Sequence, residues 1–284
     1  MNSNTVIKNE IIIEGKDKKS ITLDITYLEK SNNQPLVIFC HGFKGFKDWG
    51  AFNQMAEMFA KNNFIFAKFN FSHNGTSPSD YSDIHDLEAF GQNNFEIELD
   101  DLDRVLNWFN EDTNRFKNTD NKHEIYTIGH SRGGGIVMLK ASEDSRIKKV
   151  VAWASVNDFE KYMFLSDTVK WKETGVSFVD NSRTGVKLPL YYQFYENFYA
   201  NKNRFDLIEN VMKLSIPVLL IHGTKDETVN IEDAEWIYEN LDHSILVKIE
   251  GGNHAFGASH PWVKDSLPDS LSIAIDETIE FFTL

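Results

Sequence analysis

One stretch, residues 125–139, constrains the fold more than any other part of this chain. It begins with β-branched and aromatic residues, continues as Gly-His-Ser-Arg-Gly at 129–133, and ends in a run typical of a helix. Gly-x-Ser-x-Gly between a strand and a helix is typical of a serine held on a strained turn at the end of a sheet. A Cβ on either outer glycine would clash where strand and helix close around that serine. We therefore interpret Ser131 as a catalytic nucleophile, with a purely structural glycine turn as the alternative.

Length, charge and cysteine content favour one α/β enzyme domain. The chain has 284 residues and a formal net charge of −14, which disfavours nucleic acid and anionic membranes as partners because both are polyanions. Residues 1–10 contain no apolar signal segment, and no uninterrupted apolar run is long enough to span a membrane. The single cysteine, Cys40, excludes an internal disulfide and lies in an apolar run, where we expect inert packing. We expect a cytoplasmic protein without a membrane span.

Strand and helix patterns alternate along most of the chain. Segments rich in β-branched and apolar residues predict strands at 10–14, 21–27, 35–40, 64–71, 149–154, 217–221 and 245–249, besides the strand before Ser131. Amphipathic spacing predicts helices at 51–61, 95–109, 233–241 and 267–282, besides the helix after Ser131. This alternation predicts an α/β protein with a mostly parallel central sheet, helices on both faces and an antiparallel hairpin at its start.

Residues 156–212 interrupt the alternation. They separate two predicted core strands by far more than an ordinary connection, so we expect an inserted cap subdomain there, with a core made of 1–155 and 213–284. The insertion carries twelve of the 37 aromatic residues, and they recur too densely around 191–199 for one helix face. We expect some of them to face the sheet and others, Tyr192 and Tyr195 among them, to line a cavity over the site. The alternative is that all of them pack the subdomain itself.

A histidine follows the last predicted strand. His254 lies in a glycine-rich segment, Glu-Gly-Gly-Asn-His at 250–254, at the edge of the sheet where Ser131 is expected. A serine hydroxyl is a poor nucleophile until an imidazole accepts its proton, so we interpret His254 as the general base. The alternatives are a surface loop histidine, or a metal ligand together with His260. No carboxylate follows at metal-ligand spacing, so we expect no metal.

The candidate acid is Asp226, which follows the predicted strand at 217–221. It gives the chain order Ser, Asp, His, and a carboxylate beside the imidazole would hold the ring in the tautomer that catalysis needs. Two other carboxylates compete. Glu227 is adjacent and should point the other way, and Asp158 follows the strand at 149–154. Alternatively, Asp226 caps the helix that begins near residue 231.

An oxyanion hole is predicted where the strand at 35–40 ends in His-Gly-Phe. The Phe43 N–H would lie opposite the Arg132 N–H, giving two donors for the charge that develops on a carbonyl oxygen. Gly42 removes side-chain bulk where the substrate must pass. His41 and His73 also lie in loops at this edge, and we expect structural roles for both.

Taken together, the segments 41–43, 129–133, 223–226 and 252–254 resemble the α/β-hydrolase superfamily in residue type and order, over nearly the whole chain. The resemblance implies the α/β-hydrolase fold. The His-Gly-Phe sequence and the aromatic insertion resemble bacterial carboxylesterases of the cinnamoyl or feruloyl esterase type. They also resemble the hydrolase domain of serine peptidases related to prolyl oligopeptidase. Arg132 departs from the pattern, because it brings a cation beside the nucleophile.

These observations predict a serine hydrolase with a Ser-His-Asp triad that cleaves carboxylic esters through an acyl-enzyme, without a cofactor. The expected partner is a small ester, hydroxycinnamoyl or another small aromatic or short acyl group, bound near Gly42, Tyr192 and Tyr195. We expect no nucleic acid as a partner, and a homodimer is left open. Amide or peptide hydrolysis is one alternative. A binding protein that kept the fold and lost catalysis is the other.

Overall fold

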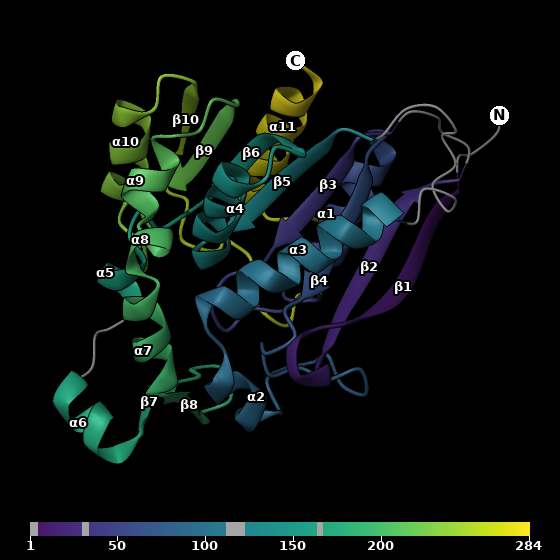
Figure 1. Cartoon of the computed structure of the whole chain (residues 1–284). Helices are drawn as coiled ribbons and strands as arrows, with labels where there is room; N and C mark the ends of the chain where they lie inside the picture. The colour runs from purple at the N-terminus through teal and green to yellow at the C-terminus, as the bar shows by residue number, and fades with distance from the viewer. Residues whose placement is uncertain (1–4, 30–33, 112–122, 164–166) are drawn as a thin grey trace.

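An eight-stranded sheet forms the centre of the molecule (Figure 1). The computed structural model describes residues 5–29, 34–111, 123–163 and 167–284. In spatial order the strands are β1 (Val6–Glu14), β2 (Ser20–Leu28), β4 (Ile65–Asn70), β3 (Leu36–Cys40), β5 (Ile125–His130), β6 (Ile147–Trp153), β9 (Val218–Gly223) and β10 (Ser244–Ile249). β1 pairs antiparallel with β2, and β2 with β4, whereas the remaining neighbours are parallel. The mostly parallel sheet with an initial hairpin confirms the expected fold class.

The central strands are apolar along their whole length because both faces of the sheet are covered. Every residue of β3 and of β9 is buried. β10, at the edge of the sheet, is mostly half-buried or exposed instead. The parallel strands β4, β3, β5, β6, β9 and β10 all end at the same edge, so the loops that follow them meet there.

Helices pack on the two faces of the sheet in two separate apolar clusters. On one face, α1 (Phe52–Lys61) and α11 (Asp269–Thr283) contribute to the cluster that contains Phe39. On the other face, α3 (Phe95–Glu111), α4 (Arg132–Glu143) and α10 (Ile231–Asn240) contribute to the cluster that contains Ile38. Because successive strand residues point to opposite faces, Ile38 and Phe39 belong to different clusters. This two-sided packing confirms helices on both faces.

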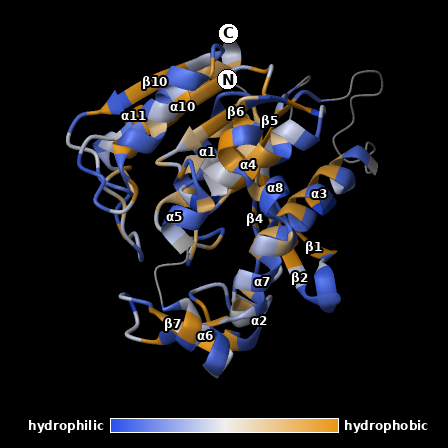
Figure 2. Cartoon of the chain, turned by 60° about the vertical axis from the view of Figure 1, so that its left-hand side comes forward, coloured by the Kyte–Doolittle hydropathy of each residue, from blue (hydrophilic) through white to orange (hydrophobic). Residues whose placement is uncertain are grey.

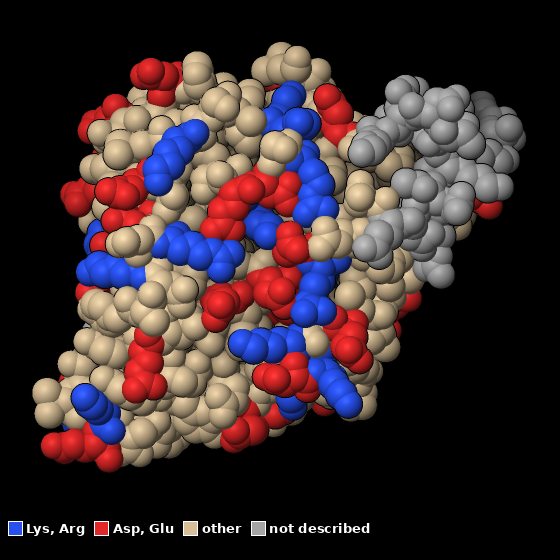
Figure 3. Space-filling view, in the orientation of Figure 1, with Lys and Arg blue, Asp and Glu red and all other residues tan. Residues whose placement is uncertain are grey.

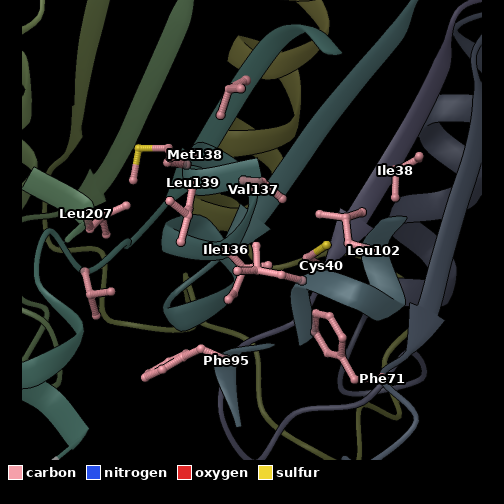
Figure 4. Packing of buried hydrophobic residues seen from close by; sticks show 14 of the residues in the cluster. Ile38, Cys40, Phe71, Phe95, Leu102, Ile136, Val137, Met138, Leu139 and Leu207 are labelled. Atoms are coloured by element: carbon pink, nitrogen blue, oxygen red, sulfur yellow. The ribbon is translucent and has the colours of Figure 1, made fainter. Parts of the chain in front are cut away.

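The larger cluster anchors the helix that follows Ser131. Figure 4 shows Cys40 of β3, Leu102 of α3 and Ile136 of α4 in one buried group. These three side chains are completely buried. Burial of a side chain the size of leucine or isoleucine contributes about 1.5–3 kcal/mol, so α4 and α3 are held firmly against the end of β3.

Residues 156–212 connect β6 to β9 through several short elements. They are α5 (Phe159–Met163), α6 (Thr168–Thr174), β7 (Val176–Asp180), β8 (Lys187–Tyr191), α7 (Gln193–Ala200), α8 (Lys202–Phe205) and α9 (Leu207–Val211). β7 and β8 form an antiparallel sheet of their own. Figures 1 and 2 both show α6 and β7 at one end of the molecule, and β8 lies beside α2 (Leu87–Gln92) in Figure 1. The hairpin and α2 were not predicted from the sequence.

The tip of the β7–β8 hairpin contacts the loops that follow β3 and β4. Arg183 donates from Nη2 to Asp83 Oδ1 at 3.0 Å and to the Lys44 carbonyl oxygen at 3.3 Å. Asn181, which is buried, donates from Nδ2 to the same Asp83 oxygen at 3.2 Å. Farther along, the Tyr191 ring lies so close to Gly91 that a Cβ on this glycine would be 2.7 Å from it. The insertion is therefore joined to the sheet's C-terminal edge at several points.

The surface over α3 and α4 carries charges of both signs. Figure 3 shows Lys and Arg side chains interleaved with Asp and Glu on this face. Pairs there include Arg104 with Asp100, and Arg146 with Asp144. In the part of the chain that the structure describes, no helix has both the length and the apolar character needed to cross a membrane.

Candidate active site

Ser131 occupies a strained turn between β5 and α4. Its backbone has φ 58° and ψ −122°, a positive φ that non-glycine residues rarely adopt. The Ser131 N–H donates to the Trp153 carbonyl oxygen at 2.8 Å, so the neighbouring strand β6 holds the turn. The turn directly follows the end of β5, so Ser131 lies at the C-terminal edge of the sheet, where the sequence predicts it.

The glycines on either side of Ser131 allow this turn. A Cβ on Gly129 would lie 2.2 Å from the Gly133 carbonyl oxygen. A Cβ on Gly133 would lie 2.4 Å from the carbonyl oxygen of Cys40 in β3. Such separations are far below contact distance, so both positions require glycine for β5, α4 and β3 to approach this closely.

Asp226 and His254 form a hydrogen-bonded pair at the same edge. Nδ1 of His254 donates to Oδ2 of Asp226 at 2.8 Å, and the other carboxylate oxygen accepts from the N–H groups of Thr228 and Val229. The Asp226 side chain is fully buried, whereas that of His254 is 22% exposed. Because Nδ1 carries the proton in this bond, Nε2 is the ring nitrogen that can accept one.

The competing carboxylates lie elsewhere. Asp158 accepts a hydrogen bond from the Glu160 N–H at 2.8 Å and so begins α5, and Glu227 is exposed. The N-cap of α10 is Asn230, which accepts from the Glu232 N–H. Asp226 is thus the carboxylate that the structure brings to His254, and it is not the cap of α10.

A second histidine, His222, to which the sequence assigned no role, also contacts the Asp226 carboxylate. Its Nε2 lies 3.2 Å from Asp226 Oδ2 and 3.0 Å from the Val229 carbonyl oxygen, with the ring fully buried. Burial acts to raise the pKa of Asp226, but hydrogen bonds from His222 and His254 outweigh it and hold the pKa well below its usual value. Asp226 is therefore ionised at neutral pH. The spacing of four residues between His222 and Asp226 is the sequence signal that could have indicated this contact.

His130, the residue before the serine, contacts the loop of His254. Its Nε2 donates to the His254 carbonyl oxygen at 2.8 Å, and the two ring centroids are 4.8 Å apart. Burial is the largest cause that lowers the pKa of His130, and the charge of His254 is the next. Together they lower this pKa to about 3. His130 is consequently neutral near pH 7 and anchors the His254 backbone to the residue that precedes Ser131. Its place inside the Gly-x-Ser-x-Gly sequence could have indicated this contact.

The Gly42–Phe43 peptide lies against the serine. The Gly42 carbonyl oxygen accepts from the Gly45 N–H at 3.0 Å and from His41 Nδ1 at 2.9 Å. In a trans peptide the C=O and N–H point in opposite directions, so these bonds turn the Phe43 N–H away from His41. A Cβ on Gly42 would lie 2.9 Å from the Ser131 Cβ. This geometry keeps the peptide next to the serine without side-chain bulk.

The loop histidines at this edge have structural contacts. His41 is buried, and its Nε2 accepts from Asn74 Nδ2 at 3.3 Å. Burial lowers the pKa of His41 to about 4, so the ring is neutral at pH 7. His73 is buried and hydrogen-bonded to Ser72 through Nδ1.

Cys40 is a free, buried thiol, and burial raises its pKa well above the usual value. Its thiol is therefore protonated and unreactive at neutral pH.

His260 accepts a hydrogen bond from the Gly50 N–H at 3.0 Å. Among the described residues, no three His, Cys, Asp or Glu side chains are grouped as ligands for a metal ion.

The aromatic side chains of α7 and of its N-cap residue, Tyr192, lie on two faces of the helix. Phe194 and Phe198 are buried, with ring centroids 5.1 Å and 5.9 Å from that of Phe95. Tyr192 and Tyr195 are half-buried, and their stacked rings are 5.2 Å apart. Within the described part of the chain, no hydrogen bond or ring contact joins either tyrosine to Ser131 or His254. Their role as substrate-binding residues stays a prediction.

A sequence model described as the alpha/beta hydrolase fold matches residues 35–205. A curated relative, the uncharacterized peptidase YtmA of Bacillus subtilis, is 32% identical over 125 residues. That match covers 42% of this chain and 42% of YtmA, so it spans under half of either protein.

Solved structures resemble this one over nearly the whole chain. Est1E from Butyrivibrio proteoclasticus has a TM-score of 0.70 at 19% identity, covering 96% of this chain and 97% of that one. It has also been solved with ferulic acid bound. The esterase domain of a Rhodothermus marinus protein has a TM-score of 0.65 at 19% identity, covering 97% of each chain. At these identities the likeness establishes the fold alone.

Proposed function

This chain belongs to the alpha/beta hydrolase fold family, and on that premise we propose that it is a serine hydrolase that cleaves carboxylic esters through an acyl-enzyme. One observation carries the proposal. The buried Asp226 carboxylate is hydrogen-bonded to His254 at the same sheet edge where Ser131 has a strained, positive φ. A serine on such a turn and an imidazole held by a carboxylate are the parts that acyl transfer needs.

The proposed reaction uses each of these groups in turn. Ser131 Oγ attacks the ester carbonyl carbon while Nε2 of His254 accepts the hydroxyl proton, and the carbonyl oxygen becomes an oxyanion. The N–H groups of Phe43 and Arg132 would donate to this oxyanion. The carbonyl then re-forms, the C–O bond to the alcohol breaks, and His254 returns the proton to the departing alcohol. Water repeats the sequence on the acyl-enzyme, releasing the acid and restoring Ser131.

We further propose that residues 156–212 act as a cap and that the acyl group is a small aromatic one, such as a hydroxycinnamoyl group. The contacts of Arg183 and Asn181 with the loops after β3 and β4 support the cap, because they place the hairpin beside the Phe43 segment. The stacked rings of Tyr192 and Tyr195, and the ferulic acid bound to Est1E, support an aromatic acyl group. Gly42 would leave the passage to Ser131 open.

Peptide or amide hydrolysis is the second candidate, and the likeness to YtmA, which is named a peptidase, favours it. Both reactions use the same serine, histidine and aspartate, and they differ in the leaving group. An amine is a much poorer leaving group than an alcohol, so His254 must protonate it efficiently. Turnover of a matched ester and anilide with one acyl group would separate the two activities.

The decisive experiment compares the wild type with Ser131→Ala. We expect a fluorophosphonate probe to label the wild type, and p-nitrophenyl esters to be hydrolysed by it. The variant should show neither, with about a 10⁶-fold lower kcat at an unchanged melting temperature, because loss of the nucleophile disables the whole triad. Labelling at another residue, or near-normal turnover by Ser131→Ala, would refute the proposal. A wild type that neither reacts nor hydrolyses any ester would instead favour a binding protein.

A further inference from the structure

Arg132, the residue that follows Ser131, takes part in a buried ion pair. Arg132, the first residue of α4, donates from Nη2 to Glu98 Oε1 of α3 at 2.5 Å. The two side chains are only 8% and 3% exposed. Arg104 and Asp100 form a typical surface pair on α3, at 40% and 42% exposure. Arg132 and Glu98 have therefore lost nearly all of their contact with water.

Stability alone does not account for such a pair. Burial lowers the pKa of Arg132 and raises that of Glu98, against the attraction between the two charges. Removing two charges from water carries a penalty that their attraction often fails to offset, so apolar side chains of similar size would serve the fold at least as well. Glu98 has a second partner, since Asn93 Nδ2 donates to the same oxygen at 2.8 Å. Glu98 thus has a fixed position at the beginning of α3.

The guanidinium also contacts two aromatic rings. Arg132 Cζ lies 4.4 Å from the centroid of the Phe43 ring and 5.7 Å from that of Phe95. Phe43 packs in turn on Phe90, with centroids 5.5 Å apart. A planar guanidinium over an aromatic face is an attractive contact that strengthens when water is excluded. The side chain of Arg132 therefore joins the N-terminus of α4 to the loop that follows β3.

Phe43 and Arg132 are also the two residues whose N–H groups are assigned to the oxyanion hole. We propose that Glu98 and the Arg132 side chain are positioning residues for this hole: Glu98 orients the guanidinium, and the guanidinium holds Phe43 so that both donors aim at one point. The inference rests on the proposed hydrolase function. Donors of an oxyanion hole must lie about 2.7–3.1 Å from the developing charge, so a small shift of Phe43 would reduce transition-state binding.

The test removes both charges together. In Arg132→Met with Glu98→Gln, the methionine keeps an apolar stem against Phe43, and the glutamine oxygen can still accept from Asn93. We expect kcat to fall about 10- to 100-fold with KM changed by less than about twofold, because only interactions specific to the transition state are weakened. The melting temperature should stay at or above that of the wild type. Arg132→Lys, which keeps the charge but lacks a flat face, should show an intermediate kcat.

A second measurement separates positioning from folding. In a trifluoromethyl ketone adduct, Ser131 Oγ adds to the carbonyl carbon, the proton passes to His254, and the ketone oxygen becomes an oxyanion in the hole. Affinity for this inhibitor should fall by the same factor as kcat/KM, whereas the parent alcohol, which forms no oxyanion, should bind equally to all variants. Arg104→Met, which removes the exposed pair on the same helix, is the matched control and should behave as the wild type.

The double variant overturns the inference if it retains wild-type kcat and inhibitor affinity. The inference also fails if the activity loss of this variant equals its fraction of unfolded protein. A wild type without hydrolysis or probe labelling contradicts the proposed function itself, so the two failures are distinguishable.

Discussion

Oδ2 of Asp226 accepts a hydrogen bond from Nδ1 of His254 at 2.8 Å, across 28 positions of sequence. The two residues follow neighbouring parallel strands, because β9 and β10 pair from Val218 with Ser244 to Gly223 with Ile249. Parallel pairing brings both loops to one edge, and the intervening α10 returns the chain to the other end of the sheet. The topology therefore places the Asp226 carboxylate and the His254 imidazole together, one from each loop.

The choice of acid gives the first prediction. Asp226→Asn should lower kcat about 10⁴-fold, because an amide can donate to Nδ1 and would stabilise the wrong tautomer of His254. Asp158→Asn is the matched control, since asparagine caps a helix about as well as aspartate and α5 should persist. Steady-state kinetics with a p-nitrophenyl ester would check both variants. A larger loss in Asp158→Asn would assign the acid to the start of α5.

Gly42→Ala tests the passage beside the serine. The added Cβ would lie 2.9 Å from Ser131 Cβ and 3.0 Å from the His130 carbonyl oxygen. Neither neighbour can move without distorting the strained turn at Ser131. We expect kcat to fall at least about tenfold, since the Phe43 N–H would be displaced with the loop. Gly185→Ala, at φ 72° with open space around it, is a control for backbone strain and should cost stability without a comparable loss of kcat. Equal activity losses in both variants would contradict a local effect.

The sequence predicted the sheet and the three loops that carry Ser131, Asp226 and His254 because each has a local signal. Apolar runs such as Leu36–Cys40 show burial on both faces, and Gly129 and Gly133 show a close approach of backbone. Their shared edge then follows from the parallel order of the strands.

Other features depend on partners that are distant in sequence. Glu98 is a carboxylate on the apolar face of α3, between Phe95 and Leu102, and only the structure shows that Arg132 neutralises it. The β7–β8 hairpin is stabilised by contacts of Asn181 and Arg183 with Asp83, about a hundred residues away in sequence. Local patterns carry no information about such pairings, so the hairpin and the ion pair were missed.

Asp101 predicts an unusual dependence of stability on pH. Burial raises its pKa to about 7, although the Ser72 N–H donates to Oδ2 at 2.7 Å. A carboxyl group whose pKa is higher in the folded than in the unfolded state binds its proton more tightly in the folded state. Proton binding by Asp101 therefore stabilises the fold fully below about pH 4, and this stabilisation is lost as pH rises to about 7. Asp101→Asn, which cannot ionise, should therefore be more stable than the wild type at pH 8, on the order of 2–4 kcal/mol.

Urea unfolding at pH 4 and pH 8 would check this prediction. The two proteins should differ little at pH 4, where Asp101 is protonated in the folded state, and the difference should open as pH increases. A constant difference between the wild type and Asp101→Asn across this range would show that Asp101 does not titrate in the fold.

Two tyrosines at the start of α7 provide the last prediction, which concerns the acyl group. Tyr192 and Tyr195 stack on each other, and Trp171 lies edge-on to both, at 5.9 Å and 6.2 Å between centroids. Phe194 and Phe198 fill the interior side of α7, whereas Tyr192 and Tyr195 are half-buried and pack at the margin of the same apolar cluster. Flat rings with phenolic hydroxyls suit an aromatic acyl group, through stacking and hydrogen bonding.

We expect kcat/KM to be higher for p-hydroxycinnamate esters than for acetyl to octanoyl esters in the wild type. Tyr192→Ala and Tyr195→Ala should reduce this preference about tenfold while acetyl turnover is little changed, because a stacked aromatic contact contributes about 1 kcal/mol or more to binding. Tyr238→Ala is the control, since Tyr238 is 49% exposed on α10. If the tyrosine variants lose melting temperature but keep the wild-type ratio of the two ester classes, the rings only pack the insertion. The selectivity of the enzyme must then come from other residues.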